Sequence, residues 1–301
     1  MEFLELLENI RVPGLNELML GITELGSVGA FLVIALTILW CFSKKLGYYL
    51  FAVGFLGTVA NQFMKLAFHI PRPWVLNENL TIVEEARRTA GGYSFPSGHT
   101  QNAVGTFGTL LRVTDKKWVK IVSITLIIGI PFSRMYLGVH TPWDVLASFV
   151  IGAILVFMLY PVFMGNHSHS IVYFFACMIL VSIGFLCYTE FYPFSQVVDR
   201  ENLDEAVQVS YTLLGAISGF AVACYADYKW IRYPTDAVWW AQIIKVCGGI
   251  LLIIVVKSVL KVPLTSLFGH CGERAIRYFL VTITAGCIWP LTFRYFSYLR
   301  R

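Results

Sequence analysis

Long apolar segments recur along the whole chain and constrain its fold more than any other feature. Nine segments approach the roughly 20 residues that a helix needs to cross the hydrocarbon core of a bilayer. They span residues 24–42, 46–69, 97–113, 118–134, 142–164, 170–188, 207–226, 238–258 and 275–296. Only 14% of the residues are charged, against roughly 25% in a soluble domain. The sequence therefore predicts an all-α, polytopic membrane protein with about nine transmembrane helices.

Lys and Arg residues in the loops predict how these segments are oriented. With nine crossings, the most basic loops and the C-terminal tail fall on one side, and cytoplasmic loops carry the excess of Lys and Arg. We therefore expect a cytoplasmic C-terminus, an outside N-terminus, and loops 70–96 and 135–141 on the extracytoplasmic side, in the cell membrane. The net charge of +5 is modest, and we expect no nucleic-acid partner. The basic residues used are Lys44, Lys45, Arg112, Lys116, Lys117, Lys120, Lys229, Arg232, Arg294, Arg300 and Arg301.

The end of the second segment carries Lys65, followed by Arg72 between two prolines. An ionisable residue within a membrane span is costly and for that reason often functional. Seven residues make about two helical turns, so Lys65 and Arg72 could face the same direction. Pro71 and Pro73 end the helix and stiffen the backbone around Arg72. The alternative is a snorkelling lysine and an interfacial arginine.

The stretch Pro96-Ser97-Gly98-His99 has the composition of a helix start, with Ser97 as its N-cap. The first amides of a helix have no internal partners, and with the helix dipole they make a site for an anion. Gly98 allows a ligand to approach the backbone closely, and His99 falls in the first turn. The alternative is an ordinary capped helix start with an unrelated histidine.

Arg134, His140 and Asp144 form a third cluster, between the fourth and fifth segments. His140 and Asp144 are four residues apart, so one helical turn brings them close. A carboxylate on one imidazole nitrogen fixes the tautomer and raises the basicity of the other, as a nucleophilic or general-base histidine requires. The sequence from Thr141 to Asp144 also matches a capping box with proline at the first helical position. Asp144 could cap the helix, orient His140, or do both.

Together the three clusters suit a phosphate group. They place three cations, a helix N-terminus and two histidines on one membrane face. The cations and amides would hold the oxygens, one histidine would attack, and the other would donate a proton. No cluster of Asp and Glu indicates a bound metal, so the cations would supply electrostatically what a metal supplies elsewhere. We expect no metal and no other cofactor.

The motifs resemble, in family order, the three signatures of the type 2 phosphatidic acid phosphatase (PAP2) superfamily. They read Lys65-x6-Arg72-Pro73, Pro96-Ser97-Gly98-His99 and Ser133-Arg134-x5-His140-x3-Asp144, and no signature position departs from the family pattern. The resemblance implies that His140 attacks phosphorus to form a phosphohistidine, that Asp144 orients it, and that His99 protonates the leaving alcohol. It implies a metal-free reaction in which the phosphate is bound by Lys65, Arg72, Ser97, Gly98 and Arg134.

The resemblance also predicts the organisation of the chain within one membrane domain. It implies a PAP2-like catalytic helical core at 24–165 and additional transmembrane helices at 166–301. The alternation of Glu2, Glu5 and Glu8 with apolar residues separately predicts an amphipathic N-terminal segment at 1–23. This layout is similar to that of glucose-6-phosphatase and sphingosine-phosphate phosphatases.

The loop after the eighth segment carries a further group of basic residues. It is similar to the basic residues after the second segment but does not amount to a repeat. Its members are Lys257, Lys261, His270, Arg274 and Arg277.

The expected function is hydrolysis of a lipid phosphomonoester or diphosphate at the extracytoplasmic face, among membrane lipids. Phosphatidate-type, lysolipid, sphingoid-base, phosphatidylglycerol-phosphate and polyprenyl diphosphate substrates stay open. One alternative is hydrolysis of a soluble sugar phosphate, for which loop 74–95 is long enough to form a lid. Others are phosphotransfer from His140 to an acceptor other than water, and a non-catalytic anion-binding protein or transporter. Intact His99, His140 and Asp144 argue against the last.

Overall fold

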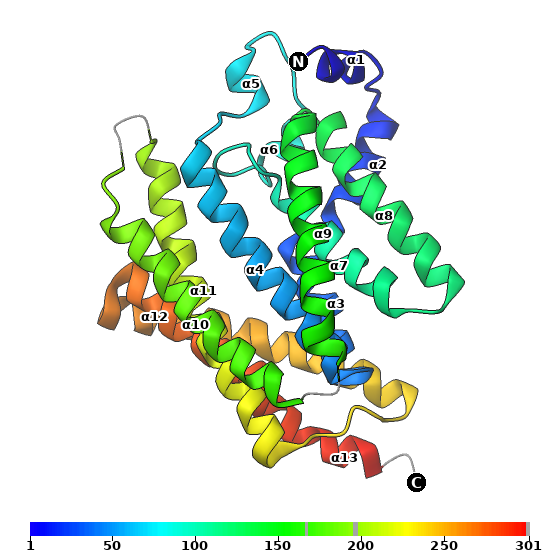
Figure 1. Cartoon of the computed structure of the whole chain (residues 1–301), viewed down its shortest axis with the longest axis vertical. Helices are drawn as coiled ribbons and strands as arrows, with labels where there is room; N and C mark the ends of the chain where they lie inside the picture. The colour runs from blue at the N-terminus through cyan, green and yellow to red at the C-terminus, as the bar shows by residue number, and fades with distance from the viewer. Residues whose placement is uncertain (166–167, 195–197, 299–301) are drawn as a thin grey trace. The chain divides into compact units, whose positions relative to one another are not determined.

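A computed structural model describes residues 1–165, 168–194 and 198–298, and all secondary structure in these ranges is helical (Figure 1). This confirms the predicted all-α fold. The α-helices are α1 (Glu2–Asn9), α2 (Pro13–Glu24), α3 (Val28–Cys41), α4 (Lys44–Phe68), α5 (Pro73–Leu76), α6 (Glu84–Arg87), α7 (Gly98–Val113), α8 (Lys117–Tyr136), α9 (Pro142–Met164), α10 (Ser168–Phe191), α11 (Arg200–Ala226), α12 (Trp239–Ile283) and α13 (Phe293–Tyr298). Between them lie the π-helices η1 (Asp227–Ile231) and η2 (Thr284–Ile288) and the 3-10 helix η3 (Trp289–Thr292).

The chain is a multi-pass membrane protein, but the expected count of nine spans is not confirmed. In the described ranges, six helices are long and apolar enough to cross a bilayer, or seven if α2 and α3, bent by 47°, form one span. The predicted segment 97–113 corresponds to α7, which has only 16 residues and a first turn of polar side chains. Segments 238–258 and 275–296 fall within one helical run, Trp239–Tyr298.

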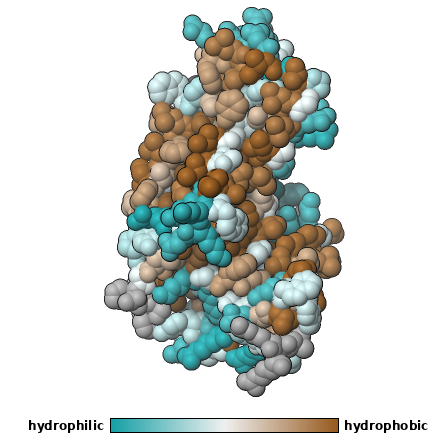
Figure 2. Space-filling model, turned by 90° about the vertical axis from the view of Figure 1, so that its right-hand side faces the viewer, coloured by the Kyte–Doolittle hydropathy of each residue, from teal (hydrophilic) through white to brown (hydrophobic). Residues whose placement is uncertain are grey.

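Large apolar side chains cover much of the surface, as Figure 2 shows for one face. Ile128, Phe157 and Leu180 are each more than 60% exposed, on three different helices. Side chains of this size in such numbers would form a large apolar surface on a soluble monomer. In a bilayer the lipid tails cover them, which agrees with the apolar composition of the chain.

The chain is divided into two compact units. The first comprises Met1–Leu32, Leu56–Leu159 and Gln196–Asn202, and the second Val33–Phe55, Tyr160–Ser195 and Leu203–Arg301. Several helices, including α4 and α9, contribute to both units. The predicted division at residues 23 and 165 therefore stays a prediction.

The N-terminal helix α1 is anchored in the first unit. Leu4 and Leu7 are buried in an apolar cluster with residues from the loop before α7 and from the end of α8. The remaining members of the cluster's buried core are Leu80, Val83, Ala86, Ala90, Tyr136, Leu137 and Val139. Arg11 Nε donates to the Tyr136 carbonyl at 2.8 Å, and Arg11 Nη1 donates to the Thr81 carbonyl at 2.6 Å. These contacts fix the turn that leads into His140.

In the second unit, α12 and the residues after it form an antiparallel hairpin. The helix is broken at Gly269, whose φ of 68° is left-handed and favours glycine. Trp289 Nε1 donates to the Lys245 carbonyl at 2.9 Å, and Arg277 Nη1 donates to the Lys257 carbonyl at 3.4 Å. Since both pairs are centred close to residue 267, the two arms run in opposite directions.

Candidate active site

Two of the predicted phosphate-binding cations lie where α4 ends. Lys65 Nζ donates to the Gly91 carbonyl at 3.2 Å. The Arg72 side chain is buried, and its Nε donates to the Gly92 carbonyl at 2.9 Å while its Nη2 donates to the Gly91 carbonyl. Its Nη1 donates to the Val139 carbonyl and lies 3.0 Å from His140 Nε2. Arg72 therefore links the loop before α7 to the histidine.

Ser97 begins α7 as the sequence predicts. Its buried side chain accepts a hydrogen bond from the Thr100 amide, which caps the helix. The space beside Gly98 is open, since a Cβ atom there would have only Asn61 Oδ1, at 3.9 Å, within 4 Å. His99 Nε2 is buried without a hydrogen-bond partner among the described residues. The start of α7 thus has free space and an unsatisfied imidazole beside its first amides.

His140 and Asp144 meet at the start of α9. His140 Nδ1 lies 3.4 Å from Asp144 Oδ2, and both side chains are only 2% exposed. Asp144 Oδ2 also accepts from the Thr141 amide at 2.7 Å and from Ser94 Oγ at 2.6 Å. The carboxylate caps α9 and faces His140 at once, so the two roles left open by the sequence are compatible.

Arg134 is fully buried at the end of α8. Its Nη1 donates to Thr23 Oγ1 at 3.1 Å and to Thr89 Oγ1 at 3.0 Å, while Nη2 donates to the Thr89 carbonyl at 3.4 Å. Buried polar groups need such partners because an unsatisfied charge inside a protein is costly.

One loop segment, Thr89–Gly92, therefore contacts all three cations. We call it the collar. Lys65 donates to the carbonyl of Gly91, Arg72 to those of Gly91 and Gly92, and Arg134 to Thr89. Gly92 has a φ of 66°, a conformation that glycine adopts without strain. The sequence does not predict the collar; it indicates only that residues 74–95 form a polar loop long enough to act as a lid.

Burial, and after it the surrounding positive charges, favour the neutral form of His140. Burial lowers its pKa well below the ordinary value of 6.5, and the positive charges of Arg72, Arg134 and Lys65 lower it further. Asp144, although 3.4 Å away, does not reverse this direction. Arg72 can only donate, so His140 Nε2 is the acceptor and the imidazole proton sits on Nδ1, toward Asp144.

The free energy of unfolding should therefore decrease as the pH drops below about 6.5, the ordinary pKa of histidine. Below pH 6.5 the unfolded chain binds a proton at His140, whereas the folded protein keeps this histidine neutral. The contribution of His140 to the free energy of unfolding is therefore complete above pH 6.5 and is lost progressively below it. We expect Tm in detergent to decrease between about pH 7.5 and pH 5, and the decrease to be smaller in His140→Asn. An identical pH dependence of Tm in the two proteins would contradict this.

The three motifs lie within a region that matches a family model described as the PAP2 superfamily, over residues 42–168. An undecaprenyl-diphosphatase of Sulfolobus acidocaldarius is 30% identical over 158 residues, which cover 52% of this chain and 75% of that protein. The chain belongs to the PAP2 superfamily. The resemblance inferred from the motifs is thereby confirmed.

Other comparisons extend the PAP2 assignment. A model described as a PAP2 superfamily phosphatase, transmembrane extension, matches residues 211–301. Phosphatidylglycerophosphatase B of Bacillus subtilis is 32% identical over 163 residues, which cover 50% of this chain and 75% of that protein. Human sphingosine-1-phosphate phosphatase 2 is 27% identical over 196 residues, which cover 62% of this chain and 45% of that protein. No solved structure gives a significant match.

All eight residues predicted from the PAP2 motifs lie in the first unit. The structure links Arg72 to His140 and His140 to Asp144, and it joins the three cations through the collar. Sequence reasoning missed Thr23, Asn61, Thr89 and Ser94, which contact the site from outside the motifs. Of these four residues, only Ser94 lies close in sequence to a motif, three residues before Ser97. The catalytic and binding roles themselves stay predictions.

Proposed function

We propose that this PAP2 protein hydrolyses a lipid phosphomonoester or diphosphate through a phosphohistidine on His140. The observation that carries the proposal is the orientation of His140. Its Nδ1 faces Asp144, and its Nε2 lone pair faces the guanidinium of Arg72. A phosphate held by Arg72 would therefore lie next to an unprotonated imidazole nitrogen, as in-line attack requires.

The reaction would proceed in two steps. His140 Nε2 attacks phosphorus, and the bond from phosphorus to the leaving oxygen breaks as His99 gives that oxygen a proton. Water, activated by His99, then attacks the phosphohistidine and releases phosphate and His140. Lys65, Arg72, Arg134 and the first amides of α7 balance the charge on the phosphoryl oxygens in both steps. No metal is needed in this scheme.

Binding of the phosphate would rearrange the collar contacts. In the structure, the carbonyl oxygens of Gly91 and Gly92 accept hydrogen bonds from Lys65 and Arg72. Phosphoryl oxygens are stronger acceptors because they are charged, and they would replace these carbonyls. The negative charge would also favour a protonated His99. In the free protein its pKa is lowered to about 3 by burial and by the neighbouring cations Arg134, Arg72 and Lys65.

Asp144→Asn should lower kcat by about 10- to 100-fold, less than loss of the nucleophile. Asparagine can keep the hydrogen bond from the Thr141 amide, but it loses the charge that stabilises the imidazole proton. Ser94→Ala is the matched control, because it removes one hydrogen bond to the same oxygen and keeps the charge. If Asp144→Asn were as damaging as His140→Ala, Asp144 would take part in proton transfer rather than orient His140.

The position of the site at helix ends and the names of the relatives both support a lipid substrate. The cations lie at the ends of helices long enough to span, which is where a lipid presents its phosphate. The three relatives described above are named for phosphatases of lipids. The orientation predicted from basic loops puts this site on the extracytoplasmic face of the cell membrane.

The test is to compare kcat/KM for one phosphorylated head group on long and on short chains, with glucose 6-phosphate as the soluble reference. Each buried methylene contributes about 0.8 kcal/mol, so the long-chain substrate should be favoured at least about tenfold. Free phosphate released by the purified protein in detergent is the readout. Glucose 6-phosphate turned over as well as the best long-chain lipid would overturn the lipid proposal.

A further inference from the structure

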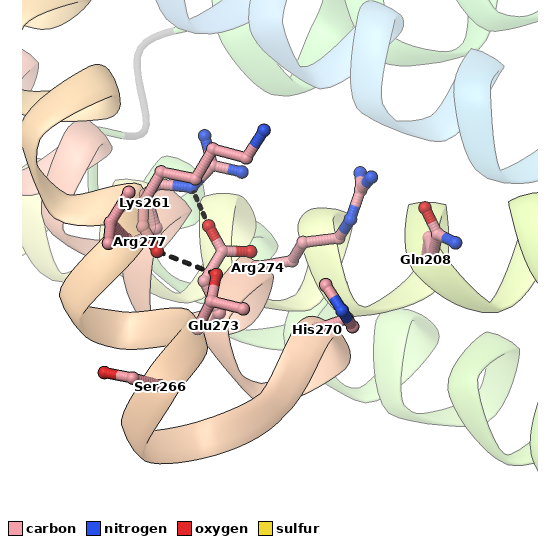
Figure 3. Close-up of a pocket in the computed structure, with 9 residues that line it drawn as sticks. Gln208, Lys261, Ser266, His270, Glu273, Arg274 and Arg277 are labelled. Atoms are coloured by element: carbon pink, nitrogen blue, oxygen red, sulfur yellow. Dashed lines mark hydrogen bonds and ion pairs between the residues drawn. The ribbon is translucent and has the colours of Figure 1, made fainter.

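The C-terminal hairpin carries a basic pocket that the catalytic site does not use. The pocket has a volume of about 560 Å³ and lies within the second unit. Figure 3 shows the ends of Lys261, Arg274 and Arg277 pointing to the same side of the hairpin, while Gln208 approaches from α11. Pockets of roughly 300–1,000 Å³ hold small ligands. This one has room for a phosphorylated head group.

The pocket carries an excess of positive charge. Arg277 and Glu273 are both buried and form an ion pair, so their charges cancel. Lys261 and Arg274 make no ion pair with any carboxylate in the described part of the chain. Two other carboxylates, Glu190 and Asp204, act electrostatically on Cys271, and Glu190 accepts a hydrogen bond from Tyr211. Neither of them lines the pocket. Two cationic side chains are therefore available to a ligand.

The hairpin turn places this charge at a membrane boundary. Trp239–Tyr298 is apolar, and its two arms meet at the break at Gly269. The turn between two apolar arms lies where the hydrocarbon ends, at the depth of lipid head groups.

We propose that the pocket binds a phosphate group without turning it over. Lys261 and Arg274 would contact the phosphoryl oxygens, and the Gln208 amide would donate from α11, so that the ligand ties α11 to the hairpin. The ion pair of Glu273 with Arg277 forms the fixed wall. His270 and Glu273 both line the pocket, but Glu273 is paired with Arg277, and no ion pair among the described residues joins it to His270. We therefore expect the pocket to hold its ligand without hydrolysing it. The phosphate belongs either to an anionic phospholipid or to free phosphate.

Native mass spectrometry of the full chain in detergent tests this, with phosphatidylglycerol, phosphatidylcholine and inorganic phosphate as probes. We expect phosphatidylglycerol to bind at least about tenfold more tightly than phosphatidylcholine, and this preference to be lost in Lys261→Gln with Arg274→Gln. Loss of one bound inorganic phosphate in the double variant would identify free phosphate as the ligand. Loss of the phosphatidylglycerol preference alone would identify the lipid.

Two control variants keep the test specific. Lys116→Gln with Lys117→Gln removes the same charge from an exposed site at the start of α8 and should leave the binding of both probes unaffected. Lys261→Arg with Arg274→Lys keeps the charge and should keep binding. Unchanged binding of both probes in the Gln variant would overturn the proposal. The proposal would also be overturned if the Lys116 and Lys117 control, or the charge-conserving variant, lost as much binding as the Gln variant. The measurement needs no turnover, so its outcome is independent of the proposed phosphatase activity.

Discussion

His140→Ala is expected to lower kcat by about 10⁴-fold or more, the largest effect of any single substitution in this protein. The variant removes the nucleophile, whereas Lys65, Arg72 and Arg134 still bind phosphate. Phosphate affinity should therefore remain within about threefold of the parent protein. The same substitution should abolish an acid-labile phosphohistidine, trapped by rapid quenching during turnover and found by mass spectrometry of the peptide that contains residue 140.

The comparison that isolates the nucleophile is with His99→Ala. If His99 is the acid, substrates with better leaving groups should recover part of the activity of His99→Ala but none of that of His140→Ala. Near-normal turnover in His140→Ala would contradict the phosphohistidine mechanism. So would a phosphohistidine that still forms on another residue in that variant.

Arg72→Lys is expected to lower kcat/KM by about 10²–10³-fold. The three nitrogens of the planar Arg72 guanidinium contact four partners: Nε contacts Gly92, Nη2 contacts Gly91, and Nη1 contacts both Val139 and His140. A lysine ammonium is a point charge and cannot make these contacts together. It would also leave the buried Val139 carbonyl without the donor that Arg72 supplies, and it would remove the group that orients the His140 lone pair.

Arg87→Lys is the matched control for this substitution. Arg87 lies in the same loop, but it is half exposed and pairs with Glu84 on the surface. Exposed ion pairs contribute little, so kcat/KM should change by less than about twofold. Equal losses of kcat/KM in the two variants would show that the loop tolerates no Arg→Lys change. That result would contradict a specific role for Arg72.

The class of fold and the family could be predicted from the sequence, and so could the closeness of His140 to Asp144. These depend on features that are local along the chain. Apolar runs of sufficient length predict membrane helices whatever their neighbours are. Ser97 at a helix start and Asp144 four residues after His140 are governed by the geometry of one helical turn, and both contacts are present.

Packing between distant segments decided which groups satisfy the buried cations and how the chain is divided. The collar reaches Lys65 and Arg134 across 26 and 45 residues, and Thr23 reaches Arg134 across 111. No periodicity predicts such contacts, because they form when separate helices pack and buried donors take whichever acceptors lie nearest. The expected count of nine spans is not confirmed. The segment expected at residues 97–113 is the short helix α7, and the segments expected at 238–258 and 275–296 lie in one helical run that is broken at Gly269.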